Sequence, residues 1–164
     1  MPKENQLLVQ QWLERPRNFF IYLGRAGCGK TYLTAAMMNY LYPKALERNP
    51  FVEFYFYPQD VLLQAYRTSY GKSWDDWSTK DKVMRANLLA IDDFGSTRNN
   101  EWQRDEIWEI VRFRSAEHKL TIFSSNLEFA EIEEHFYPRV RSRLEADENT
   151  IIYDWETDHR ITKE

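Results

Sequence analysis

Residues 24–31 read Gly-Arg-Ala-Gly-Cys-Gly-Lys-Thr, and this spacing of glycines lets successive backbone N–H groups turn inward around a phosphate. An apolar run at 19–23 precedes the loop and a helical pattern follows it, which is the context that nucleoside triphosphate binding requires. The lysine would contact the β- and γ-phosphates and take part in the reaction, and the threonine hydroxyl would contact Mg²⁺. We predict nucleotide contacts from Gly24, Arg25, Ala26, Gly27, Cys28, Gly29, Lys30, Thr31 and Tyr32.

Two carboxylates follow a second apolar run. Residues 88–91 read Leu-Leu-Ala-Ile, as expected of a strand buried on both faces of a parallel sheet, and Asp92 and Asp93 come next. We predict that Asp92 holds the Mg²⁺ shell, and that Asp93 orients or deprotonates an attacking water. An alternative role for Asp93 is to cap the turn at Gly95, because Asp is favoured at turns and caps.

An amide follows a third apolar run, at 121–124. Asn126 would lie at the carboxyl edge of the sheet, where ligands bind in open α/β folds. Its side chain can hydrogen-bond both a water and a γ-phosphate oxygen, so we predict a catalytic role. The alternative is a loop residue or an N-cap for the helix expected near Glu128.

Three arginines occupy alternate positions near the end of the chain. On a helix Arg139 and Arg143 share a face and Arg141 does not, so we expect Arg141 to be a solvated surface residue. A guanidinium group is well suited to offset charge that develops on a transferring phosphoryl, in cis or from a neighbouring subunit.

Aromatic and basic residues alternate between the second and third expected strands, at Tyr66, Arg67, Tyr70, Lys72, Trp74 and Trp77. Single-stranded nucleic acid binds such mixtures by stacking and by backbone attraction. We expect the tip at Tyr70–Lys72 to be the candidate DNA contact, whereas the tryptophans also fit a core or a partner interface.

Strands alternate with helices along the chain, which predicts a mostly parallel sheet covered on both sides. We expect helices that end before Pro16 and before Pro43, two helices within 59–86, and further helices at 101–118, 128–135 and 138–145. The strands are expected at 19–23, 51–57, 88–91, 121–124 and 150–154.

The composition narrows the class of protein. We expect one domain over residues 1–164, and a cytoplasmic one, because no run approaches the length of a membrane span. The net charge of −4 argues against a protein that coats nucleic acid non-specifically. The single cysteine and three dispersed histidines offer no metal-ligand pair, so the only metal expected is Mg²⁺ held with the nucleotide.

The four motifs, in this order and spacing, resemble the bacterial DnaC/DnaI helicase loaders and their IstB transposition-helper relatives among the AAA+ ATPases. The motifs are Gly24–Thr31, Leu-Leu-Ala-Ile-Asp-Asp-Phe-Gly at 88–95, Thr-Ile-Phe-Ser-Ser-Asn at 121–126 and Arg-Val-Arg-Ser-Arg-Leu at 139–144.

The resemblance implies an α/β fold of the P-loop NTPase (AAA+) type. This is a three-layer sandwich with a five-stranded parallel sheet in the order 5-1-4-3-2 and little or no C-terminal lid. It also implies ATP and Mg²⁺ as cofactors, with Asp92 and Asp93 as the metal-binding and catalytic carboxylates. In the same way Asn126 takes the sensor-one position, Arg143 the trans-acting arginine finger and Arg160 the sensor-two position.

The partners that the resemblance implies are a ring-shaped replicative helicase, single-stranded DNA, and further copies of the chain in a ring or filament. The loaders usually carry an N-terminal helicase-binding domain, whereas here the loop begins 23 residues after Met1. We therefore expect either an excised ATPase core or a natural minimal protein.

Other functions stay open at this point. An IstB-like transposition helper carries the same motifs, and a small-molecule (nucleotide) kinase also pairs a phosphate-binding loop with arginines. A nucleotide-gated adaptor would bind ATP with little hydrolysis and would use Asp93 structurally. A GTPase is disfavoured because the chain has no Asn-Lys-x-Asp segment.

Overall fold

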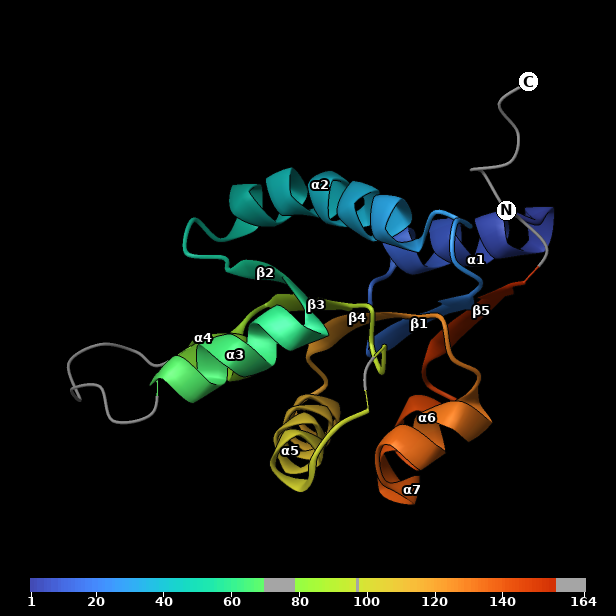
Figure 1. Ribbon diagram of the computed structural model, residues 1–164. Coiled ribbons are helices and arrows are strands. Elements are labelled where there is room, and N and C mark those ends of the chain that lie inside the picture. Colours follow the sequence, from blue (N-terminus) through green and yellow to red (C-terminus); the bar gives the residue numbers. More distant parts are fainter. Residues whose placement is uncertain (70–78, 97, 156–164) are drawn as a thin grey trace.

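The computed structural model describes residues 1–69, 79–96 and 98–155, and five strands in this part of the chain form a single sheet (Figure 1). The strands are β1 (Phe19–Gly24), β2 (Phe54–Pro58), β3 (Leu88–Asp92), β4 (Leu120–Ser125) and β5 (Thr150–Asp154). The helices are α1 (Lys3–Glu14), α2 (Lys30–Arg48), α3 (Gln59–Ser69), α4 (Thr79–Arg85), α5 (Glu101–Ala116), α6 (Phe129–His135) and α7 (Pro138–Leu144).

All neighbouring strands run parallel, in the order β2-β3-β4-β1-β5. Read from the other edge this is 5-1-4-3-2, so the expected fold is confirmed. The carboxyl ends of β3, β4 and β1 therefore lie side by side in the middle of the sheet, and each of these strands leads directly into one of the predicted motifs.

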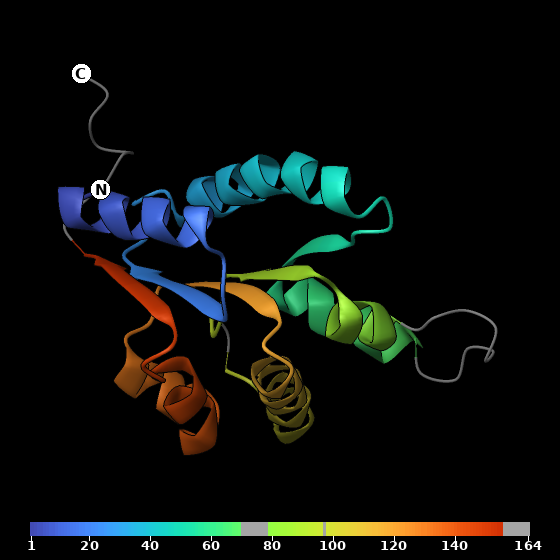
Figure 2. The same ribbon diagram turned by 180° about the vertical axis from the view of Figure 1, so that it is seen from behind.

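The helices cover both faces of the sheet and form a three-layer sandwich. Figures 1 and 2 show α1 and α2 on one face and α3 to α7 on the other. β1 is buried along its whole length and its side chains alternate between two cores. Phe19, Ile21 and Leu23 pack with the layer of α3 to α7, whereas Phe20 and Tyr22 pack with α1 and α2.

The expected end of α2 at Pro43 is wrong, because the helix continues through Pro43 to Arg48. A proline inside a helix removes one backbone donor and strains the preceding turn. Both Pro43 and Asn39, whose carbonyl loses its helical partner, are exposed, so water can satisfy the freed group. Beyond Pro43, Leu46 and its neighbours are good helix formers that support continuation.

The expected start of β2 at Phe51 is also wrong, since the strand begins at Phe54. The side chain of Asn49 accepts a hydrogen bond from the Phe51 N–H at 2.9 Å, and the Asn49 carbonyl accepts one from the Val52 N–H at 3.2 Å. These bonds form a turn, and the apolar Phe51 is 85% exposed. The apolar run therefore does not mark the strand boundary.

Within the described residues no helix combines the length and the apolar content that crossing a membrane requires.

Candidate nucleotide-binding site

The glycine loop, residues 24–31, joins the buried β1 to the first turn of α2. Gly29 is the N-cap of α2 with a left-handed φ of 92°, and no side chain caps this helix end. The first backbone N–H groups of α2 are therefore available to an anion. A Cβ atom at Gly24 would lie 2.5 Å from the carbonyl oxygen of Asp154, so the end of β5 requires glycine there.

Lys30 is 6% exposed, and its side chain folds back over the glycine loop. Its ammonium group donates to the carbonyls of Gly24 at 2.7 Å and Arg25 at 2.9 Å, and also to the side-chain oxygen of Asn126. Burial lowers the pKa of Lys30, and nearby acidic groups including Asp93 oppose this shift. One ammonium thus links the loop to the end of β4, where the sequence predicted a polar contact.

Asp92 forms the second link between the loop and the sheet. Asp92 is 3% exposed, and its carboxylate accepts hydrogen bonds from the Thr31 hydroxyl at 2.6 Å and from the Ser124 hydroxyl. A carboxylate and a hydroxyl are oxygen ligands of the kind that Mg²⁺ takes, alongside water and substrate phosphates. The described residues contain no cluster of three or more His, Cys, Asp or Glu side chains able to hold a metal.

Asp93 is exposed and has a left-handed φ of 52°, while the residues on either side of it are buried. Its carboxylate accepts no hydrogen bond from any described residue; only its carbonyl takes part in the turn, accepting from Ser96 at 3.0 Å. Burial, and then the charge of Asp92, raise the pKa of Asp93, whereas Lys30 lowers it. The alternative in which the Asp93 side chain caps the turn is therefore wrong.

Asn126 follows β4 and is not the N-cap of α6. That position belongs to Glu128, whose backbone N–H donates to the side chain of Glu131 at 2.8 Å. The Asn126 side chain is instead committed to Lys30. The N-cap alternative is therefore wrong, and the catalytic role of Asn126 stays a prediction.

The three arginines of α7 differ in their contacts. Arg141 pairs with Glu133 at 3.0 Å and Glu145 at 2.8 Å. Arg139 lies 4.5 Å from the ring centre of Trp108 and 4.4 Å from that of Tyr137. Arg143 is exposed, and its side chain makes no hydrogen bond or ion pair with any described residue. Among these residues, no hydrogen bond or ion pair joins the arginines to the glycine loop of the same chain.

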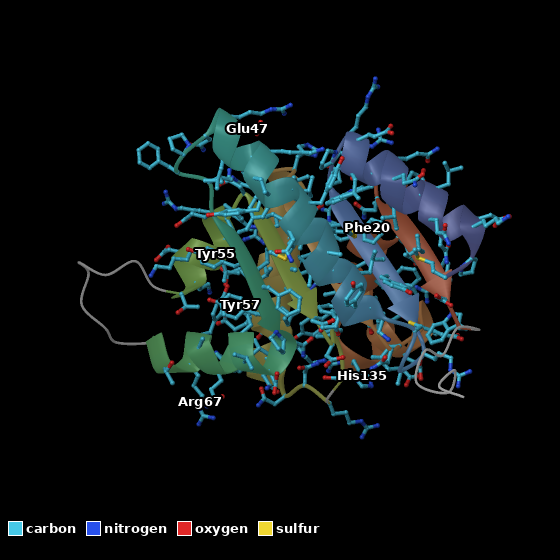
Figure 3. The ribbon with its side chains drawn as sticks, turned by 90° about the horizontal axis from the view of Figure 1, so that it is seen from above. Phe20, Glu47, Tyr55, Tyr57, Arg67 and His135 are labelled. Atoms are coloured by element: carbon cyan, nitrogen blue, oxygen red, sulfur yellow. The ribbon has the colours of Figure 1, made fainter. Side chains whose placement is uncertain are left out.

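Several predicted residues contribute less to this geometry. Tyr32 is 83% exposed, and its contact with a nucleotide stays a prediction. Tyr66 is 1% exposed and belongs to the core, whereas Arg67 on α3 points away from the sheet (Figure 3). The predicted Arg160, the Tyr70–Lys72 tip, and Trp74 and Trp77 lie outside the described residues.

The sequence interpretation missed three polar residues near the site. Ser124 holds Asp92, and the Ser125 hydroxyl donates to the carbonyl of Phe94. Gln59, at the start of α3, is 1% exposed and bonds to the segment that follows Asp93. Both serines lie in the motif at 121–126, so their position at the end of a strand could have predicted that they lie near the site. Gln59 carried no such signal, because its partners are 36 and 40 residues away.

Comparisons with known proteins agree with this fold. A family model described as IstB-like ATP binding protein matches residues 3–141. YqaM of Bacillus subtilis (strain 168), described as uncharacterized, is 29% identical over 122 residues, covering 71% of this chain and 36% of YqaM. The replicative helicase loader DnaI of the same organism is 27% identical over 124 residues, covering 73% of this chain and 36% of DnaI.

The chain thus matches 36% of the length of each of these curated relatives. The crystal structure of the DnaC helicase loader has the same fold, with a TM-score of 0.76 at 21% identity, covering 92% of this chain and 88% of that chain. Because the family model matches most of the sequence and the sheet order agrees, the chain belongs to the IstB-like ATP-binding proteins, within the DnaC/IstB group of AAA+ ATPases.

Proposed function

We propose that this protein binds ATP together with Mg²⁺ and hydrolyses it. The observation that carries the proposal is the convergence of three strand ends, where Lys30 meets Asn126 and Thr31 meets Asp92. Asp93 is exposed and follows the buried Asp92 directly in the sequence, so it lies next to this cluster. A carboxylate with no hydrogen-bond partner, beside a buried lysine and a metal-type oxygen pair, is arranged for work on a water rather than for structure.

Each residue of the site has a defined task in this proposal. The uncapped N–H groups of α2 and the Lys30 ammonium bind the phosphates, and Thr31 and Asp92 hold the metal. Mg²⁺ supplies neutralisation of the charge on the β- and γ-phosphate oxygens when it is bound. Asp93 orients a water and accepts its proton, and Asn126 hydrogen-bonds the same water. Arg143 acts on the site of a neighbouring copy, which is consistent with its unpaired, exposed side chain.

The partners are part of the same proposal. DnaI is a replicative helicase loader and covers most of this chain in sequence, which supports a ring helicase as the client. The matching family is described as IstB-like, which supports a transposase as the second candidate client. We propose that single-stranded DNA and self-association raise the rate of ATP hydrolysis.

A nucleotide kinase is the alternative, and it would transfer the phosphate to a nucleoside or nucleotide rather than to water.

Replacement of Asp93 by Asn tests the proposal. The amide keeps the size of the side chain but cannot accept a proton, so turnover of Mg-ATP should fall by about a hundredfold or more, the usual contribution of a positioned base. Affinity for a fluorescent ATP analogue should stay within about twofold, because Lys30 and the glycine loop are untouched.

Asp147→Asn is the matched control, since Asp147 is exposed and lies outside the site. It should hydrolyse ATP at the wild-type rate. Equal turnover in Asp93→Asn and wild type would instead support the nucleotide-gated adaptor, in which Asp93 has no catalytic task.

A further inference from the structure

Gln59 is a buried amide that joins the start of α3 to the segment between β3 and α5. It follows the edge strand β2 directly and is 1% exposed. Its side-chain oxygen accepts the backbone N–H of Gly95 at 2.9 Å, and its side-chain nitrogen donates to the side-chain oxygen of Asn99, also at 2.9 Å. A single side chain therefore holds Gly95, inside the turn that Asp93 and Ser96 close, and Asn99, just before α5.

The orientation of this amide is determined by the backbone. Gly95 is a donor, so the oxygen of Gln59 must face it and the nitrogen must face Asn99. The side-chain nitrogen of Asn99 is buried without a hydrogen-bond partner among the described residues. This unpaired group costs free energy, and it is tolerated where the Asn99 oxygen has to face Gln59.

The residues on both sides of Asp93 are held by hydrogen bonds. Before it, Asp92 is fixed by Thr31 and Ser124. After it, the Phe94 N–H donates to the Ser124 carbonyl at 2.8 Å, and Gly95 is bound to Gln59. The left-handed φ of 52° at Asp93 persists because these neighbours determine it. The Gln59 anchor comes from α3, Thr31 belongs to the first turn of α2, and Ser124 belongs to the central strand β4.

We propose that Gln59 is a positioning residue, which holds Asp93 at the angle that hydrolysis requires and transmits any displacement of α3 to it. The inference rests on the proposed ATP hydrolysis. Asp60 and Asn100, the neighbours in sequence of the two bonded side chains, both line a groove of about 690 Å³ between α3 and α5. A shift of one helix against the other therefore stretches the bond between Gln59 and Asn99 and moves the turn that carries Asp93.

The test is Gln59→Met, which keeps the length of the side chain and removes both hydrogen bonds. The kcat for ATP hydrolysis should fall about tenfold or more, because small misplacements of a catalytic group are costly. Affinity for the ATP analogue should stay within about twofold of wild type, since no nucleotide contact changes. Gln64→Met is the matched control, with the same change on the exposed face of α3, and it should leave kcat unchanged.

A second variant separates positioning from folding. Asn99→Ala removes one of the two bonds at a half-buried position, so it should lower kcat by a smaller factor. Because both variants break one linkage, the double variant should be no slower than Gln59→Met alone. Independent, multiplying losses in the double variant would overturn the inference, and so would a Gln59→Met protein with the kcat of wild type. If wild-type protein itself hydrolyses no ATP, the proposed function fails first and this inference falls with it.

Discussion

Arg143 differs from the other arginines of α7 in the number of groups that already hold its side chain. Arg139 is stacked against two aromatic rings and lies 4.0 Å from Asp105, and Arg141 is bound by two glutamates. Moving either of these would break existing contacts. The Arg143 side chain can reach a neighbouring molecule without losing a contact to any described residue, so it is the arginine best suited to act in trans.

Arg143→Ala should therefore abolish any rise of specific ATP turnover with protein concentration while ATP binding persists. An arginine that stabilises the transferring phosphoryl contributes about a thousandfold or more in related enzymes. Arg141→Ala is the control and should keep the concentration dependence, since exposed ion pairs contribute little. The measurement is turnover per molecule over a range of protein concentrations.

Mixing two inactive variants gives a stricter form of this test. In a mixture of Arg143→Ala and Asp93→Asn, an Asp93→Asn copy can lend its arginine to the intact Asp93 of its neighbour. Partial recovery of turnover is expected, and its absence, with both proteins folded, would argue against action in trans.

At the scale of elements, α4 is held in place by a side chain from α5. Arg114 is fully buried, and its guanidinium donates to the carbonyls of Val83 at 2.8 Å and Ala86 at 3.1 Å, at the end of α4. It also donates to the Leu120 carbonyl at 2.6 Å and the Thr121 hydroxyl at 2.9 Å. Burial lowers the pKa of Arg114 to about 9, so the group is still charged at neutral pH. One cation thus satisfies helix-end carbonyls that would otherwise be buried without a donor.

Arg114→Met should destabilise the protein by about 3 kcal/mol or more, because it leaves several buried carbonyls unpaired. Arg112→Met, on the exposed side of the same helix, should change stability by about 0.5 kcal/mol or less. Urea unfolding followed by circular dichroism measures both values. Similar unfolding midpoints for the two variants would show that Arg114 is not needed to cap α4.

The element boundaries show where local signals are sufficient. Buried central strands are fully enclosed and carry continuous apolar runs, so β1, β3 and β4 lie within one residue of the expected bounds at each end. At Pro43 and Phe51 a strong local signal was misleading. A helix tolerates an exposed proline when its freed carbonyl meets water, and an Asn-mediated turn keeps an aromatic residue out of the adjacent strand.

For the whole molecule, a binding experiment can decide between the two proposed clients, a replicative helicase and a transposase. With ATP and Mg²⁺ present, immobilised protein should retain a purified replicative helicase, and more of it than of a transposase; single-stranded DNA should increase the retained amount. Asp93→Asn should retain at least as much as wild type, since ATP persists on a variant that does not hydrolyse it. Preferential retention of the transposase would assign the transposition-helper role instead.

The amino-acid sequence alone was sufficient to predict which strand ends carry the candidate site residues. The glycine loop, the Asp92-Asp93 pair and Asn126 each follow an apolar run, and this pattern is sufficient to predict that they stand at strand ends. The sheet order was implied by the resemblance to the DnaC/IstB family and not by periodicity, because a hydrophobic pattern records burial and not which strand lies beside which.

Which side chains contact one another follows from the packing of the folded chain. Lys30 and Asn126 are 96 residues apart and Thr31 and Asp92 are 61 apart, and they touch because the strand order places β1, β4 and β3 side by side. Gln59 also contacts residues that are distant in sequence, because Gly95 and Asn99 lie between β3 and α5. Hydrogen bonds between segments that are distant in sequence form only when the helices pack on the sheet. Residue type and spacing alone therefore could not predict these contacts.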